Sequence, residues 1–146
     1  MKVENLRYII QVLRKHKSIQ RISLSSCNLS DESAELLSIL MKSNPNIKAI
    51  NLSGNKFTSN GLNEIMEGIK SGCNKQLEEL DFSYNPIGDL GILTLCRIIE
   101  NSILPNVKRI YLKEVSNQII FTYTYLLNLY YIYIYIYIYI YVFMYL

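Results

Sequence analysis

The chain has 146 residues, a length typical of one domain, but its composition changes near residue 115. All 15 basic and all 12 acidic residues lie within 1–114, whereas ten of the 13 tyrosines lie within 123–145. The charges are interspersed and the net charge is only +3, so composition favours neither a nucleic acid nor an anionic membrane as partner.

The chain starts with a helical pattern over residues 1–18, in which apolar residues recur at Leu6, Ile9, Ile10 and Leu13. Charged residues between them leave no apolar run of the signal-peptide type. The three cysteines at 27, 73 and 96 are odd in number and far apart, unlike a disulfide framework or a zinc site. These features predict a cytoplasmic chain.

Four segments that start near residues 19, 47, 77 and 107 repeat one apolar pattern, at spacings of 28, 30 and 30 residues. The first three fit L-x-x-L-x-L-x-x-N/C-x-L without a gap, and the fourth keeps only its apolar triad. The alternation at Ile22 and Leu24 predicts a short strand that points both side chains to one face. Asn55, Asn85 and Cys27 occupy the same place in their repeats, where the chain leaves the strand.

A helical pattern follows each of the first three strands, and Asp31 or Ser30 is expected to cap the first of these helices. A small residue recurs near each helix start, at Ser33, Gly61 and Gly91, and would let the helix lie close to the sheet. Such strand–helix units stack into a right-handed solenoid.

The pattern resembles leucine-rich repeats, and its spacing is similar to that of the ribonuclease-inhibitor-like subclass. The resemblance covers about three quarters of the chain. It implies an α/β solenoid with a parallel sheet on the concave face, formed by a repeat domain over 1–114. It also implies that the side chains of Asn55 and Asn85 bond to neighbouring backbone groups left free by the turn. Residues 1–18 align with the helix half of a repeat, so we expect a slice of a longer repeat protein, through a truncated gene product or an internal initiation codon.

Residues 115–146 form an uncharged, low-complexity tail that alternates Tyr and Ile over 131–141. A TA dinucleotide repeat read in frame encodes this alternation, which makes translated non-coding DNA the first interpretation. The length also suffices for a membrane anchor, although tyrosine prefers the bilayer interface. The third interpretation is an aggregation-prone strand.

No motif for catalysis, a cofactor or a metal is present in the sequence. His16 is the only histidine and lies in a polar turn, and the carboxylate pairs Asp31–Glu32 and Glu78–Glu79 are sequence neighbours that do not face each other. Cys73 has no histidine near it in sequence. The chain is therefore predicted to be no enzyme, and to bind no cofactor, metal or nucleic acid.

The outward residues of the strands form the candidate binding face, because repeat proteins bind partners on this surface. The alternative is that they are ordinary solvated strand residues. The candidate residues are Arg21, Ser23, Asn51, Ser53, Glu79, Asp81, Tyr84, Arg109, Tyr111 and Lys113.

The leading functional hypothesis is a protein-interaction module, a fragment of an intracellular scaffold or regulator. Resemblance to the Ran GTPase-activating family makes a GTPase-activating regulator an alternative, without a matching catalytic residue. Further alternatives are a protein tethered to a membrane through residues 115–146 and a non-functional truncated gene product. The protein partner is not specified by the sequence.

Overall fold

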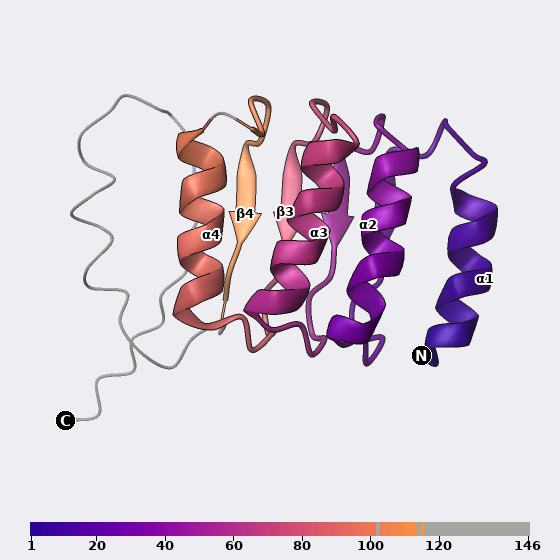
Figure 1. Ribbon diagram of the computed structural model, residues 1–146, viewed down its shortest axis with the longest axis horizontal. Helices are drawn as coiled ribbons and strands as arrows, with labels where there is room; N and C mark the ends of the chain where they lie inside the picture. The colour runs from indigo at the N-terminus through magenta and orange to yellow at the C-terminus, as the bar shows by residue number, and fades with distance from the viewer. Residues whose placement is uncertain (102, 114, 116–146) are drawn as a thin grey trace.

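The computed structural model describes residues 1–101, 103–113 and 115, so residues 116–146 of the predicted tail lie outside the described residues. Helices and strands alternate along the chain and form two layers (Figure 1). The elements are α1 (Val3–Leu13), β1 (Arg21–Ser23), the 3-10 turn η1 (Asp31–Ser33), α2 (Ala34–Ser43), β2 (Ala49–Asn51), α3 (Ser59–Ser71), β3 (Glu79–Asp81), α4 (Gly88–Glu100) and β4 (Arg109–Tyr111).

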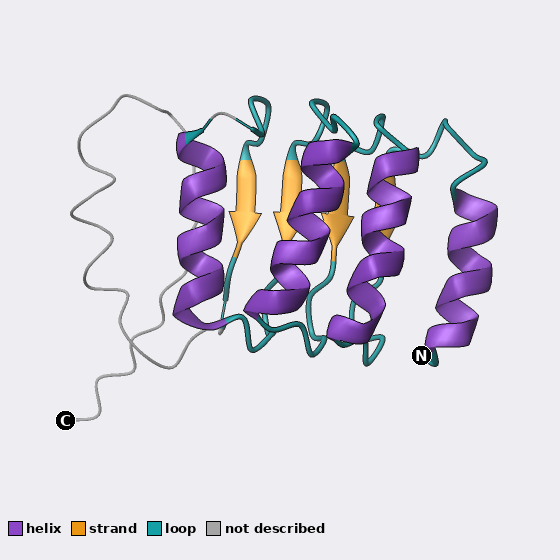
Figure 2. Ribbon diagram, in the orientation of Figure 1, coloured by secondary structure: helices purple, strands orange, loops and turns teal. Residues whose placement is uncertain are grey.

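The strands form one parallel sheet in the order β1-β2-β3-β4, and the helices lie side by side across one face of it (Figure 2). The register pairs Ile22 with Ile50, Ile50 with Leu80, and Leu80 with Ile110. Equivalent positions of the repeats therefore stand side by side. The predicted α/β architecture of strand–helix repeats is confirmed.

The core lies between the two layers and is built from the apolar positions of the repeat. Leu52 and Phe82, which follow the strands, are fully buried, as are Leu37 and Ile65 from the helices. In α1, Leu6 and Ile10 are buried but Ile9 is 39% exposed, because α1 packs on α2 and η1 alone among the described elements. Val115 is also buried, and its carbonyl accepts a hydrogen bond from the Gly88 amide.

Two buried asparagines join the turns of successive repeats. The Asn85 side-chain amide donates to the carbonyls of Leu52, Phe82 and Ser83 at 2.9, 3.0 and 3.1 Å, and its oxygen accepts from the Phe57 amide at 3.1 Å. Asn55 repeats this arrangement one unit earlier, with the Leu24 carbonyl at 2.9 Å and the Leu29 amide at 3.0 Å. These bonds satisfy backbone groups that the turn leaves without strand partners, as the sequence predicts.

The predicted cap of the first inter-strand helix is wrong. Neither Ser30 nor Ser33, the residues preceding η1 and α2, makes a side-chain cap hydrogen bond. The Asp31 carboxylate instead accepts from the amide and the hydroxyl of Thr58, at 2.9 and 2.5 Å. Asp31 thus joins two repeats, because Thr58, the cap residue of α3, lies within its reach across the solenoid.

Small residues let neighbouring repeats approach each other closely. The sequence pattern predicted such a role only between a helix and the sheet. A β-carbon on Gly61 would lie 2.2 Å from the Asp31 carboxylate, and one on Gly68 would lie 2.5 Å from the Ser38 α-carbon. The backbones of α2 and α3 therefore touch where Gly68 faces Ser38.

Within the described ranges, no helix combines the length and hydropathy needed to span a bilayer.

The asparagine bonds predict a large loss of stability for Asn85→Ala. This change removes the bonds from Asn85 to the buried Phe57 amide and to the Phe82 carbonyl, whereas the Leu52 and Ser83 carbonyls keep bonds from Asn55 and from the Gly54 amide. Each unsatisfied buried group costs about 1–3 kcal/mol, so we expect a loss of about 2 kcal/mol or more in unfolding free energy. Urea denaturation of Asn63→Ala, an exposed asparagine on α3, is the matched control and should change little. Equal midpoints for the two variants would contradict the structural role of Asn85.

A second stability prediction concerns Gly68→Ala. Helix propensity alone would favour alanine by about 1 kcal/mol. The added β-carbon, however, would meet the Ser38 backbone, and overpacking of this kind costs about 1–3 kcal/mol. Because the obstacle is backbone, we expect the clash to win and the urea midpoint to fall; a raised midpoint would show that α2 and α3 separate easily.

Candidate functional site

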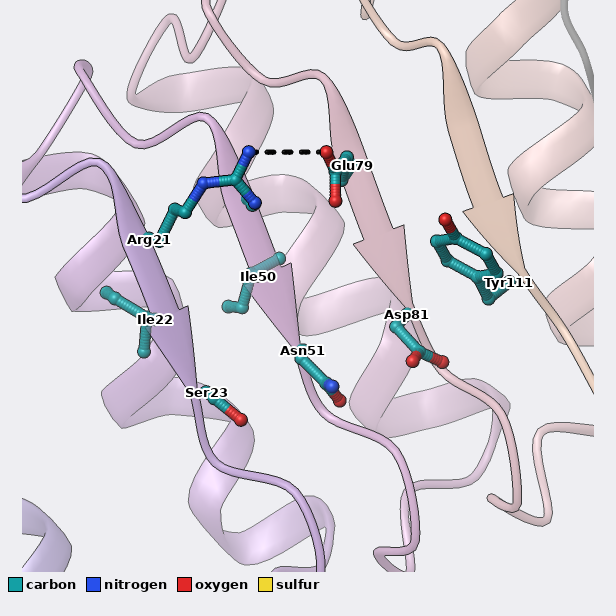
Figure 3. A pocket seen from close by; sticks show the side chains of 9 residues that line it. Arg21, Ile22, Ser23, Ile50, Asn51, Glu79, Asp81 and Tyr111 are labelled. Atoms are coloured by element: carbon teal, nitrogen blue, oxygen red, sulfur yellow. Dashed lines mark hydrogen bonds and ion pairs between the residues drawn. The ribbon is translucent and has the colours of Figure 1, made fainter.

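The uncovered face of the sheet brings the predicted binding residues into rows that cross the strands (Figure 3). The first row is Arg21, Ala49, Glu79 and Arg109, and the second is Ser23, Asn51, Asp81 and Tyr111. Except for Arg109, these residues line a shallow hollow of about 360 Å³, together with Ile22 and Ile50. We call this surface the sheet face.

A shared carboxylate organises the first row. Glu79 is 19% exposed and accepts hydrogen bonds from Arg109 beside it and from Arg21 two strands away, the latter at 3.4 Å. The Arg21 side chain reaches Glu79 by crossing β2 at Ala49, whose small side chain leaves the path open (Figure 3). The Glu79 carboxylate raises the pKa of Arg109. Two guanidiniums thus share one carboxylate, and Arg21 keeps 70% of its side chain exposed.

Two side chains of the second row bond to the turns that follow their own strands. The Asn51 oxygen accepts from the Ser53 amide at 2.9 Å and from its hydroxyl at 2.7 Å, and an Asp81 oxygen accepts from the Ser83 amide at 2.9 Å. Both groups are half-buried and retain further hydrogen-bonding capacity. Tyr111 closes the row on β4.

The residues after the strands behave differently from one another. Ser83, which occupies the same place in its repeat as the candidate residue Ser53, is buried, and its hydroxyl accepts from the Lys113 amide at 3.1 Å. Tyr84 is 45% exposed, and the Lys113 ammonium lies 5.3 Å from its ring centroid, within cation–π range.

Tyr84 adopts a backbone conformation that suits glycine. Its φ is 57°, and the equivalent residues of the two preceding repeats, Gly54 and Ser26, have φ of 65° and 52°. A left-handed conformation costs a side chain such as tyrosine about 1–2 kcal/mol. Because three successive repeats share this conformation, it belongs to the turn, and it fixes the direction in which Tyr84 leaves the backbone.

The sequence pattern missed one charged group next to the sheet face. Glu78 pairs with Lys108 at 3.0 Å, and the hydrogen bond from Lys108, with the charges of Lys108, Lys48 and Arg109, lowers the pKa of Glu78. The residue directly precedes β3, so the 30-residue repeat spacing could have placed it between Lys48 and Lys108.

The described residues hold few groups suited to catalysis. His16 is exposed in the loop after α1, and the three cysteines are free, with Cys73 exposed. Over residues 1–101, 103–113 and 115, no group of three or more His, Cys, Asp or Glu side chains is arranged to hold a metal ion. The described surface thus offers hydrogen-bond donors, acceptors and tyrosines for recognition.

The fold and this face define a class of protein, the parallel strand–helix solenoid with an open sheet surface. The Leucine Rich repeat family model matches residues 15–38, 43–66 and 73–96, so each match covers one strand and much of its helix. The chain is a leucine-rich repeat protein.

The curated relatives are much longer than this chain. It is 33% identical over 82 residues to a Tonsoku-like protein of Mus musculus, a match that covers 56% of the chain and 6% of the relative. It is 27% identical over 95 residues to NACHT, LRR and PYD domains-containing protein 13 of Homo sapiens, covering 64% of the chain and 9% of that protein. The chain therefore spans less than a tenth of the length of either relative.

Two solved structures share the fold. Leiomodin-1 Actin-Binding Site 2 superposes with a TM-score of 0.67 at 20% identity, over 77% of this chain and 64% of that one. The tropomodulin C-terminal domain of Caenorhabditis elegans superposes with a TM-score of 0.65 at 19% identity, over 80% and 70%. At these identities the likeness concerns the fold alone.

The left-handed conformation of Tyr84 predicts an unusual order of stability. Tyr84→Gly should be about 1 kcal/mol more stable than Tyr84→Ala, because both lose the ring but only alanine keeps the steric cost. At Tyr8, which is 68% exposed on α1, the order should reverse, because glycine is the poorer helix former by about 1 kcal/mol. Urea unfolding of the four variants measures both differences, and the same order at both positions would contradict the assigned strain.

Proposed function

We propose that this chain is a protein-interaction module whose sheet face binds another protein, and that it acts without catalysis as part of an intracellular scaffold or regulator. The observation that carries the proposal is the arrangement of arginine, carboxylate, amide and tyrosine side chains in fixed rows over a shallow hollow. A rigid surface of this composition favours recognition, since little side-chain freedom is lost on binding.

The residue types also fit a protein interface. Arginine and tyrosine are enriched among the residues that dominate binding energy, and the face presents Arg21, Arg109, Tyr84 and Tyr111. Glu79 orients the Arg109 guanidinium before a partner arrives, whereas Arg21, bound to Glu79 at 3.4 Å, stays largely exposed to a partner.

The size of the sheet face limits its affinity. Four strands about 4.8 Å apart span only about 15 Å across the sheet. A stable interface buries about 800 Å² on each partner, so a partner held only by this face would bind weakly. A tighter complex requires contacts at the loops or beyond the described residues.

The other hypotheses have less support. A GTPase-activating role rests on family analogy, and no group on the sheet face favours it over simple binding. A membrane tether depends on residues 115–146, of which only Val115 lies within the described part of the chain. A cytoplasmic location is our proposal, and it rests on the three cysteines, whose odd number and wide spacing are unlike the disulfide framework of a secreted domain.

The proposal is tested with two double variants of matched composition. Arg21→Gln with Tyr111→Ser alters the sheet face, and Arg7→Gln with Tyr8→Ser removes the same residue types from exposed positions of α1. Each tagged full-length chain is cross-linked in cells, and captured proteins are quantified by mass spectrometry. We expect specific partners to be retained by the α1 variant and to fall about tenfold or more with the sheet-face variant.

Actin is a defined candidate for a direct measurement, because the leiomodin-1 fragment of similar fold is an actin-binding site. Cosedimentation with actin filaments compares the same two variants. Equal capture of every partner by the two double variants would contradict a binding role for the sheet face.

A further inference from the structure

The loops lie at two opposite edges of the solenoid, and basic residues gather at one edge whereas acidic residues gather at the other. At the edge where helices end and strands begin, uppermost in Figure 1, the loops and last helical turns are rich in lysine and arginine. We call this surface the basic edge: Arg14, Lys15, Lys17, Lys42, Lys48, Lys70, Lys75 and Lys108. At the opposite edge, Asp31, Glu32, Glu35 and Glu64 line a shallow hollow. The net charge of +3 therefore conceals a strong asymmetry.

Several of these cations have structural roles. Lys42 and Lys70 lie in the last turns of α2 and α3, where the helix dipole favours positive charge. The Lys17 ammonium donates to the carbonyls of Arg14 and Ser43, and Lys108 pairs with Glu78. For such residues, the stability of the fold is a sufficient explanation.

Three lysines remain, one on each of three successive loops. Lys15, Lys48 and Lys75 belong to the loops before β1, β2 and β3, and in the described part of the chain none of their ammonium groups has an ion-pair or hydrogen-bond partner. Within the described ranges, no internal ion pair accounts for these three lysines, which stand at different places in their loops.

The loops that carry the basic edge are linked to one another. The Asn46 side chain donates to the Lys17 carbonyl at 3.0 Å, and the Asn106 side chain donates to the Lys75 carbonyl at 2.7 Å. Buried Asn74 donates to the Asn44 carbonyl at 2.9 Å in the same layer. The backbone that displays the lysines is thus fixed before binding, which lowers the entropy that a partner must offset.

We propose that the basic edge is a second binding surface and that its occupant is an acidic segment of a protein. The edge already accommodates a carboxylate, because Glu78 lies within the electrostatic influence of Lys108 and Lys48 and has a lowered pKa. Residues 14–20, 42–48, 72–78 and 103–108 contain no Phe, Tyr or Trp, and His16 is the single aromatic ring there, so these loops offer no series of rings on which successive bases could stack. An acidic peptide carries its carboxylates on separate, flexible side chains, which can reach individual lysines and avoid Glu78. A nucleic acid carries its charge on a continuous phosphate backbone, which would approach Glu78 and be repelled by it.

The test uses two triple variants of the full-length chain that have equal net charge. Lys15→Gln, Lys48→Gln and Lys75→Gln neutralise the basic edge without removing an ion pair. Lys2→Gln, Arg7→Gln and Lys56→Gln remove the same charge from exposed positions elsewhere. Fluorescence anisotropy measures the binding of a labelled oligoglutamate peptide and of a labelled oligothymidylate at about 0.05 and 0.2 M salt.

We expect the wild-type chain to bind oligoglutamate in a salt-sensitive manner, the edge variant to bind it about tenfold more weakly, and the control variant to keep its affinity. Equal weakening in both variants would show that net charge alone is responsible and would overturn the proposal. So would the absence of oligoglutamate binding, or tighter, edge-dependent binding of oligothymidylate, which would assign the edge to nucleic acid. Circular dichroism of the three chains should be superposable, which separates these outcomes from misfolding.

Discussion

The register of the sheet face depends on how two buried asparagines, Asn55 and Asn85, terminate β2 and β3. Each strand has three residues, so its pairing alone fixes little of the chain. Asn55 and Asn85 bond in two directions, to their own turn and to the preceding repeat, and so bring each turn into register with its neighbour. An aspartate could not replace them, because the side-chain nitrogen faces carbonyl oxygens and a carboxylate would be repelled there.

The fixed register gives each row its chemistry. Arg21 can share Glu79 only because the residue between them in the row is Ala49; a longer side chain there would block the path across β2. The same register places Tyr84 at the position that Gly54 occupies in the preceding repeat, with the left-handed backbone that the turn imposes. The turn is common to the repeats, whereas the side chains displayed around it differ, and this difference is what a partner can distinguish.

The period of the sequence predicted the strands, the core positions and the outward rows, because these depend on the alternation of apolar residues and on repeat spacing. It did not predict contacts whose partners lie one repeat away. Asp31 has the spacing of a helix cap but bonds to Thr58, and Gly61 and Gly68 are small because another repeat touches them. Ser83 follows the alternation of an exposed residue but is buried against the Lys113 backbone. Such contacts depend on the distance and offset between adjacent repeats in the folded solenoid, which cannot be derived from the sequence of one repeat.

The sheet face and the basic edge adjoin each other at two consecutive residues. Glu78 and Glu79 are consecutive, yet one lies among the lysines of the loop edge and the other beneath the arginines of the first row. An acidic group arriving at either place competes with a carboxylate that is already present, so it gains less than it would from an unpaired cation. Lys15 and Lys75 have no carboxylate among their printed partners in the described part of the chain, so an acidic group there would not face this competition. A partner too large for the sheet face would therefore gain most by continuing over this edge rather than by replacing Glu79.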